Sequence, residues 1–235
     1  MKFSVSQEVF KLFPELNIVM IVLKKIDNFT PEKEIANLLR QEEAYCRRYF
    51  QELKVSEHPN IACWRKAYTD FGAGSHYRSS VEALTKRVVK GKEIPSINKL
   101  VDIYNLISLK YVLPIGGEDL KKVKGNIELI LASGNENFRA LHAEVEEHPN
   151  KGEVVYVDED NDVLCRRFNW REAEKTKLTA ETTEAVIYLE ALPPVKDIDL
   201  KEAAQDFCQF VQRFCGGTVE LYLLNKNFSQ VFCSF

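Results

Sequence analysis

Three polar side chains stand close together in an otherwise apolar stretch near the middle of the chain. Asp102, Tyr104 and Asn105 fall in a segment that we expect to form a helix, capped by Ser96 and ending near Tyr111. Asp102 and Asn105 are one turn apart, so they project from neighbouring faces of that helix. Because a buried polar group needs a partner, these side chains are candidates for holding a ligand.

A glycine loop follows this helix. Gly116 and Gly117 come directly after Pro114 and Ile115 and precede an expected strand over 125–132. Glycine lets the backbone approach a ligand closely, and two exposed amide groups could donate to an oxyanion. A simple tight turn explains the two glycines equally well.

An arginine-rich segment lies further along the chain. Guanidinium groups make bidentate contacts with phosphate, and aromatic rings stack on unpaired bases, so this composition suits the single-stranded end of an RNA. An ordinary alternative is an aromatic anchor flanked by surface ion pairs. The residues concerned are Arg166, Arg167, Phe168, Asn169, Trp170 and Arg171.

The most basic part of the chain surrounds a second expected helix. Arg78 precedes a capping box formed by Ser79 and Glu82, and Gly91 ends the helix. An RNA backbone could lie along this segment, although a solvated helix face explains the same charges. The segment 60–74, with Trp64 and Tyr68, has two interpretations, a base-stacking patch or a short amphipathic helix with both rings in the core, and general burial habits favour the second.

The stretch SINKLVDIYNLISLKYVLPIGGEDLKKVKG, residues 96–125, resembles the B3/B4 region of the bacterial phenylalanyl-tRNA synthetase beta subunit. There an aspartate, a hydrophobic residue, a variable position and an asparagine on a helix precede a proline loop and a strand. In that family the region is the editing module, which hydrolyses tyrosine wrongly attached to phenylalanine tRNA. The resemblance covers residues 78–192 without any synthetase sequence around it, so the chain looks like a free-standing relative.

The resemblance implies roles for individual residues. Asn105 matches the asparagine that lines the editing pocket, and Tyr104 stands where many members have threonine. Gly116 occupies the position of a histidine that helps to organise water and the tRNA end, so the family mechanism does not transfer directly. Glu190, in an expected strand over 185–192, falls on the glutamate that reads the phenolic hydroxyl of misattached tyrosine.

Together these observations define an expected site. We expect Asn105, Gly116 and Gly117 to act in catalysis and Glu190, Tyr104 and Asp102 to bind the substrate. The expected tRNA contacts are Arg78, Arg166, Arg167, Asn169, Trp170 and Arg171.

The leading hypothesis is hydrolysis of a mischarged aminoacyl-tRNA in trans, with the acceptor end of the tRNA as partner. An aminoacyl ester is already activated, so it needs a positioned water, oxyanion donors and an anchored adenosine, and the substrate's own ribose hydroxyl could relay the proton. A non-catalytic module that binds a tRNA end or an amino acid is the alternative. An ordinary esterase lacks support because no GxSxG motif is present, and the four histidines form no metal-ligand pattern, so no metal or cofactor is expected.

Charge and composition narrow the cellular setting. A net charge of −3 and a pI near 5.9 argue against a general DNA or RNA binder. The six cysteines are scattered without a CxxC pair, as expected of reduced thiols in a cytoplasmic protein. The longest apolar run, 18–23, is too short to cross a bilayer, so no membrane partner is expected.

The order of strands and helices predicts a mixed α+β fold, and 235 residues fit one domain spanning 1–235. The resemblance sharpens this to a layered B3/B4 module, with mixed or antiparallel sheets in a sandwich and helices at its periphery. Further strands are expected over 9–12, 17–25 and 218–224, and a hairpin joins 153–158 to 163–167. Further helices are expected after Thr30-Pro31 and over 200–214.

Overall fold

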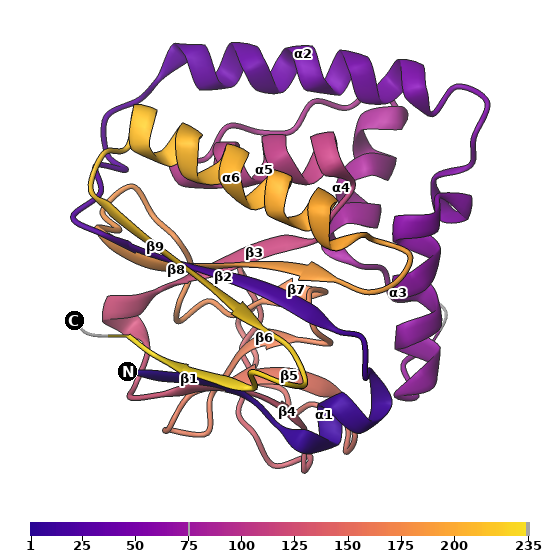
Figure 1. The fold of residues 1–235 in the computed structure, drawn as a ribbon, viewed down its shortest axis with the longest axis vertical. Coiled ribbons are helices and arrows are strands. Elements are labelled where there is room, and N and C mark those ends of the chain that lie inside the picture. Colours follow the sequence, from indigo (N-terminus) through magenta and orange to yellow (C-terminus); the bar gives the residue numbers. More distant parts are fainter. Residues whose placement is uncertain (75, 234–235) are drawn as a thin grey trace.

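The computed structural model describes residues 1–74 and 76–233. Two sheets lie one above the other, and most of the helices cover the outer face of one of them (Figure 1). The expected α+β fold with layered sheets and peripheral helices is confirmed.

The described part of the chain contains both runs of helices and runs of strands. The strands are β1 (Lys2–Val5), β2 (Asn17–Lys24), β3 (Ile115–Asp119), β4 (Ile127–Leu131), β5 (Val154–Val157), β6 (Val163–Arg166), β7 (Arg171–Glu172), β8 (Glu184–Ala191), β9 (Thr218–Leu224) and β10 (Gln230–Phe232). The α-helices are α1 (Gln7–Leu12), α2 (Lys33–Tyr49), α3 (Pro59–Asp70), α4 (Ser80–Val89), α5 (Lys99–Tyr111) and α6 (Asp197–Phe214).

The four-stranded sheet has the order β3-β8-β2-β9, and every pair in it is antiparallel. Alternate side chains of its central strand β2 point to opposite faces, as a strand requires. Ile18, Met20 and Val22 enter the core between the two sheets, whereas Val19 and Ile21 pack against the helices. Burial on both faces explains the continuous apolar run and confirms the strand expected there.

The six-stranded sheet has the order β10-β1-β4-β5-β6-β7. Only the β1–β4 pair is parallel, and β10 pairs with β1, so the two ends of the described chain lie side by side (Figure 1). The expected hairpin is confirmed as β5 and β6. Phe3, Tyr156 and Tyr188 stack between the sheets, with the two tyrosine ring centroids 4.8 Å apart.

Helices α5 and α6 pack on the outer face of the four-stranded sheet, and α2 and α4 pack around α5 (Figure 1). The interpretation of 60–74 as an amphipathic helix is confirmed by α3, since Trp64 and Tyr68 are buried. The basic segment after Arg78 forms α4, whose N-cap Ser79 accepts from the Glu82 amide.

The strand predicted over 9–12 is wrong, because these residues belong to the short helix α1. Ser6 caps it by accepting from the Val9 amide, and Val9 and Phe10 face the core. A short apolar run has no clear period, so propensity alone could not separate a strand from one helical turn.

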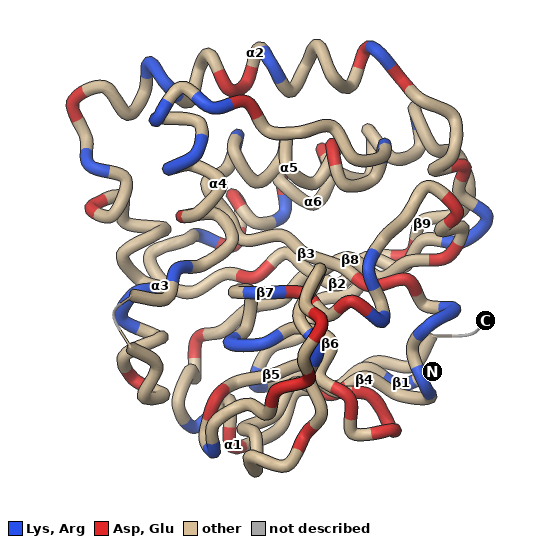
Figure 2. Tube along the Cα trace, turned by 180° about the vertical axis from the view of Figure 1, so that it is seen from behind, with Lys and Arg blue, Asp and Glu red and all other residues tan. Residues whose placement is uncertain are grey.

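Basic and acidic segments alternate over most of the surface (Figure 2). No helix within 1–74 or 76–233 is long and apolar enough to span a membrane.

Candidate functional site

Five of the twelve residues singled out from the sequence, Tyr104, Asn105, Asn169, Trp170 and Arg171, line one cavity of about 400 Å³, which we call the Asn105 cavity. Helix α5 contributes Tyr104 and Asn105, both half-buried. Helix α4 closes one side of the cavity. The opposite wall comes from the turn between β6 and β7 and from β7 itself, with Asn169, Trp170, Arg171 and Glu172.

A second cavity of about 410 Å³, the Gly117 cavity, lies next to the first. Both cavities are lined by Tyr104 and Glu172, so these two side chains form the wall between them. Gly117, His142 and Lys177 line the second cavity only. A ligand with two parts could therefore occupy both cavities and meet Glu172 at their junction.

Helix α5 places its two polar residues accurately because it is fixed at both ends. Asn98, not Ser96 as expected, is its N-cap, and the Asn98 side chain accepts from the Val101 amide at 3.0 Å. At the other end Val112 adopts a left-handed conformation with φ of 52°, and the Ser108 hydroxyl donates to the Leu113 carbonyl at 2.6 Å. Specific hydrogen bonds therefore cap both ends of the helix and hold it in place.

Asp102 does not join the other site residues. Its carboxylate accepts from the Ser96 hydroxyl and from the Ile97 amide, the latter at 3.0 Å, so it closes the loop before α5. It lines a separate cavity of about 250 Å³, beside Asn28 and Phe29. The Asp102 carboxylate therefore has a structural role at the start of α5, and its expected role in substrate binding stays a prediction.

The two glycines differ in what their amide groups face. The Pro114 carbonyl accepts from Glu190 on β8, whereas the Asp119 amide donates away from β8 to Thr176. Because backbone groups alternate sides along a strand, the Gly116 amide is directed at β8 and the Gly117 amide at the open edge of the sheet. By its direction the Gly117 amide can serve the oxyanion role expected of both glycines, and that role stays a prediction.

Both glycines lie close to neighbouring atoms. A Cβ at position 116 would lie 2.5 Å from Oε1 of Glu172, and a Cβ at position 117 would lie 2.4 Å from the backbone oxygen of Val186. The missing side chain at position 116 thus leaves room for the Glu172 carboxylate. The missing side chain at position 117 lets β3 approach β8.

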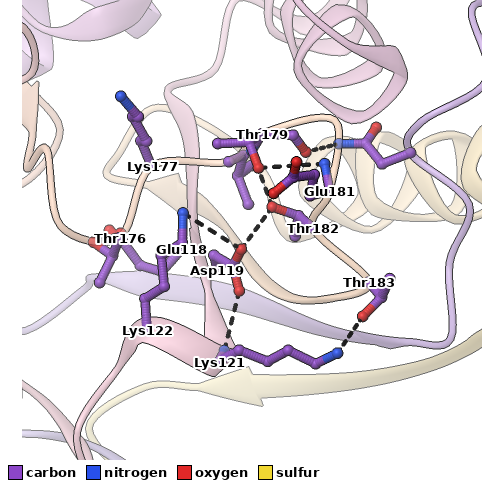
Figure 3. Close-up of polar contacts among 12 residues, drawn as sticks. Glu118, Asp119, Lys121, Lys122, Thr176, Lys177, Thr179, Glu181, Thr182 and Thr183 are labelled. Atoms are coloured by element: carbon purple, nitrogen blue, oxygen red, sulfur yellow. Dashed lines mark hydrogen bonds and ion pairs between the residues drawn. The ribbon is translucent and has the colours of Figure 1, made fainter.

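Loop 176–183 is tied to the end of β3. The Asp119 carboxylate accepts from the Thr182 hydroxyl at 2.8 Å, and Lys121 donates to the Thr183 hydroxyl at 2.6 Å (Figure 3). The Thr179 amide in turn donates to Thr182 at 2.9 Å (Figure 3). These contacts fix the wall of the Gly117 cavity that Lys177 and Thr179 form.

Glu190 lies behind the Asn105 cavity, not in its lining. Its carboxylate accepts from the Tyr156 hydroxyl and from the Asn169 amide, both at 2.5 Å, and the Tyr68 hydroxyl donates to Asn169 at 3.0 Å. Burial raises the pKa of Glu190 to about 7, against the lowering effect of its two hydrogen bonds. Glu190 therefore contacts Asn169, which does line the cavity, and the expected direct contact of Glu190 with substrate stays a prediction.

Arg166 and Arg167 are also corrected as tRNA contacts, because both are buried in ion pairs. Arg166 donates to Glu153 at 2.7 Å and to Glu147 at 2.8 Å, and Arg167 donates to Glu153 at 2.6 Å. The Arg167 guanidinium carbon also lies 3.6 Å from the centroid of the Tyr77 ring. These contacts leave neither guanidinium at the surface, where a phosphate would meet it.

Exposed cations remain at the rim of the Asn105 cavity. Arg171 is exposed and lies 5.0 Å from the centroid of Trp170, and both residues line the cavity. Arg87, part of the basic segment along which an RNA backbone was expected, lines the same cavity from α4, and Arg78 is exposed just before that helix. Arg87 and Arg171, from two parts of the chain, thus line the same cavity as Trp170.

Sequence reasoning also missed a pair of carboxyl groups. Glu118 on β3 is 1% exposed, and its carboxyl and that of Glu172 interact, each shifting the pKa of the other. Burial raises the pKa of Glu118 well above its ordinary value and that of Glu172 to about 7. No sequence motif joins these residues, because the contact depends on how the two sheets meet.

Within residues 1–74 and 76–233, no group of three or more His, Cys, Asp or Glu side chains is arranged to hold a metal ion. The six cysteines carry no disulfide, and burial raises the pKa of Cys165 well above its ordinary value.

The fold and site define a module in which two stacked sheets and a helical layer enclose adjoining cavities. The B3/4 domain family matches residues 63–216, and the chain belongs to that family. Among solved structures, the chain is similar to an N-terminal fragment of the phenylalanyl-tRNA synthetase beta subunit from Pyrococcus horikoshii, with 14% identity and a TM-score of 0.49. The match covers 92% of this chain and 49% of that one, so the chain spans about half the length of that fragment. Comparison with curated proteins finds no match.

Proposed function

We propose that the Asn105 cavity binds the aminoacyl end of a tRNA and that the protein hydrolyses the aminoacyl ester in trans. The observation that carries this proposal is the meeting of Asn105, Trp170 and Arg171 in one cavity of a B3/4 domain. An aminoacyl ester needs an oriented carbonyl, a donor for the tetrahedral oxyanion and an anchored adenosine.

Each requirement has a group on the page. The Asn105 amide orients the ester, and the Gly117 amide, at the open edge of β3, donates to the oxyanion from the adjoining cavity. The indole of Trp170 offers a face on which the terminal adenine stacks, and Arg171 beside it pairs with phosphate.

Asn169 supports selection of the amino acid. One of its amide hydrogens is bonded to Glu190, and its oxygen accepts from Tyr68, so its orientation is fixed. The remaining amide hydrogen and lone pair can face the amino acid in the cavity. Glu190 then influences the choice of amino acid at one remove.

Deacylation of a panel of charged tRNAs, including tyrosine on phenylalanine tRNA, tests the proposal. We expect rapid release from at least one mispaired species, and a loss of about 10²-fold or more in Asn105→Ala. Arg213→Ala is the control, because Arg213 is exposed on α6 and lines neither cavity. Release from no member of the panel would refute hydrolysis.

A non-catalytic binding module is the second candidate, and one observation favours it. Position 116 carries no side chain, and its amide is directed at β8 and not at the cavity. If this second function is right, the protein should bind an aminoacylated tRNA end and leave its ester bond intact.

A further inference from the structure

Glu118 and Glu172 bring two carboxyl groups together from two different sheets. Glu118 belongs to β3 of the four-stranded sheet, and Glu172 belongs to β7 of the six-stranded sheet. The Thr176 hydroxyl donates to Oε2 of Glu118, and Thr176 is itself fully buried. The pair therefore sits where the two layers meet at one end of the sandwich.

The two facing oxygens lack any other donor. Oε1 of Glu118 and Oε2 of Glu172 are both buried and accept no hydrogen bond from the described residues. Two carboxyl groups that interact in a buried site do not both remain ionised, and one shared proton satisfies both oxygens. The pair is therefore built to hold one proton.

The other end of this pair reaches the ligand space. Glu172 is half-buried and lines both cavities, together with Tyr104, whereas Glu118 lines neither. Oε1 of Glu172 fills the space that a side chain at position 116 would need. The absence of a side chain at Gly116 thus places a carboxylate at the cavity wall near Asn105.

We propose that Glu172 is the general base of the hydrolysis and that buried Glu118 positions it by sharing its proton. This inference rests on the proposed function. Water attacks the ester carbonyl carbon while its proton moves to the Glu172 carboxylate. When the tetrahedral intermediate collapses, the bond to the ribose oxygen breaks and Glu172 returns the proton to that oxygen. Water is the only co-reactant, and Glu172 ends as it began.

The surroundings of the pair suit this role. Cys165 from β6, Tyr104 from α5 and Glu190 from β8 face Glu172, and Asp158 faces Glu118 from the end of the β5–β6 hairpin. Tyr188, also on β8, faces both carboxyl groups. Apart from the two carboxylates Glu190 and Asp158, the groups that face the pair are neutral at pH 7, so burial dominates and raises both pKa values. The cations that line the ligand space are Arg87 and Arg171 in the Asn105 cavity and Lys177 in the Gly117 cavity.

A base is most effective when its pKa lies near the working pH. Because the pKa of Glu172 is raised to about 7, a large share of the protein carries an ionised Glu172 at neutral pH while Glu118 keeps its proton. Glutamine at position 118 mimics that protonated state, whereas glutamine at position 172 removes the base.

Single-turnover deacylation between pH 5.5 and 8.5 tests the proposal. We expect the wild-type rate to rise with pH and to level off near pH 7, and Glu172→Gln to lose about 10²- to 10⁴-fold in rate together with this pH dependence. Its affinity for the tRNA should stay within about twofold, because a general base acts in the transition state. The exposed control Glu146→Gln should keep the rate within about threefold.

The outcomes separate the inference from the proposed function. An active wild type with Glu172→Gln within threefold of it would overturn the role of Glu172 and leave the hydrolysis intact. A wild type that deacylates nothing would overturn both. The shared proton is read independently by infrared spectroscopy at pH 8.5, where Glu172 and Glu190, with pKa values raised to about 7, are largely ionised. A neutral carboxyl band there should disappear in Glu118→Gln, and its absence from the wild type would overturn the pairing.

Discussion

Gly116→Ala should impair function with little effect on stability, whereas Gly117→Ala should destabilise the fold. In Gly116→Ala the new Cβ meets only Oε1 of Glu172, at 2.5 Å, with the next atom at 3.6 Å. That oxygen ends a flexible side chain, so it can move by about 1 Å to reach ordinary contact distance. In Gly117→Ala the Cβ meets the Val186 carbonyl at 2.4 Å and the Ile187 Cα at 3.2 Å, and both belong to the backbone of β8.

The magnitudes follow from what has to move. In Gly116→Ala an off-rotamer Glu172 destabilises the folded state by about 0.5–1.5 kcal/mol. Replacing glycine also restricts the unfolded chain, which stabilises the folded state by about 0.4–1 kcal/mol. The melting temperature should then change by no more than about 3 °C. For Gly117→Ala a strand paired on both sides has to shift, which costs about 2–3 kcal/mol or more and lowers the melting temperature by about 5–10 °C.

Calorimetry of the two variants, with deacylation measured in parallel, checks this prediction. Gly116→Ala should fold as well as the wild type but lose about 10²-fold in rate, because a displacement of about 1 Å misplaces the carboxylate. Equal destabilisation of both variants, or full activity in Gly116→Ala, would refute the reasoning about Glu172.

Three further predictions concern charge. Burial raises the Glu190 pKa to about 7 from an ordinary value near 4.5, so the folded state binds the Glu190 proton more tightly than the unfolded state does. The stabilisation that this proton gives is complete below pH 4.5, and about 3 kcal/mol of it is lost as the pH rises to 7. Urea unfolding at pH 4.5 and at pH 7 should show a smaller difference in unfolding free energy for Glu190→Gln than for the wild type. The same difference in both proteins would contradict this prediction. Arg171→Ala should reduce the slope of log affinity for tRNA against log salt by about one, measured by filter binding, with no change in Arg213→Ala; an unaltered slope would remove Arg171 from the phosphate contacts. Glu153→Ala should cost about 3–5 kcal/mol in urea unfolding because it leaves Arg167 charged and buried, and a loss under 1 kcal/mol would contradict the importance of that pair.

Elements buried on both faces could be predicted from the sequence. The run over 17–24 became β2 because each of its faces meets a separate core, and the helix with Asn105 became α5 because it is apolar nearly all round. The segment over 9–12 could not be assigned, since a single apolar turn has the same composition as a short strand.

The site was predictable where residues line the cavity from one continuous element. Tyr104 and Asn105 on α5, and Trp170 and Arg171 on one turn, were found in this way. Contacts between distant parts of the chain could not be found, because residue type alone does not show which charges pair. Arg167 was expected at the surface, but its partner Glu153 lies across a hairpin and buries it.

Glu172 was missed for a similar reason. The turn before Glu172 is shaped by positive φ angles at Arg167 (54°) and Phe168 (60°). These residue types rarely adopt such angles, so the sequence does not predict the turn. That turn anchors Phe168 in the core and brings Glu172 to β3. The carboxyl pair therefore depends on the meeting of two sheets, which no local pattern encodes.

A structure with a non-hydrolysable analogue of an aminoacylated tRNA end, in which an amide replaces the ester, tests the central claim most directly. The account predicts adenine stacked on Trp170, the carbonyl oxygen within reach of the Asn105 side chain and the Gly117 amide, and the carbonyl carbon facing Glu172. An analogue bound elsewhere, or bound in these cavities with its carbonyl turned away from Asn105 and Glu172, would contradict it.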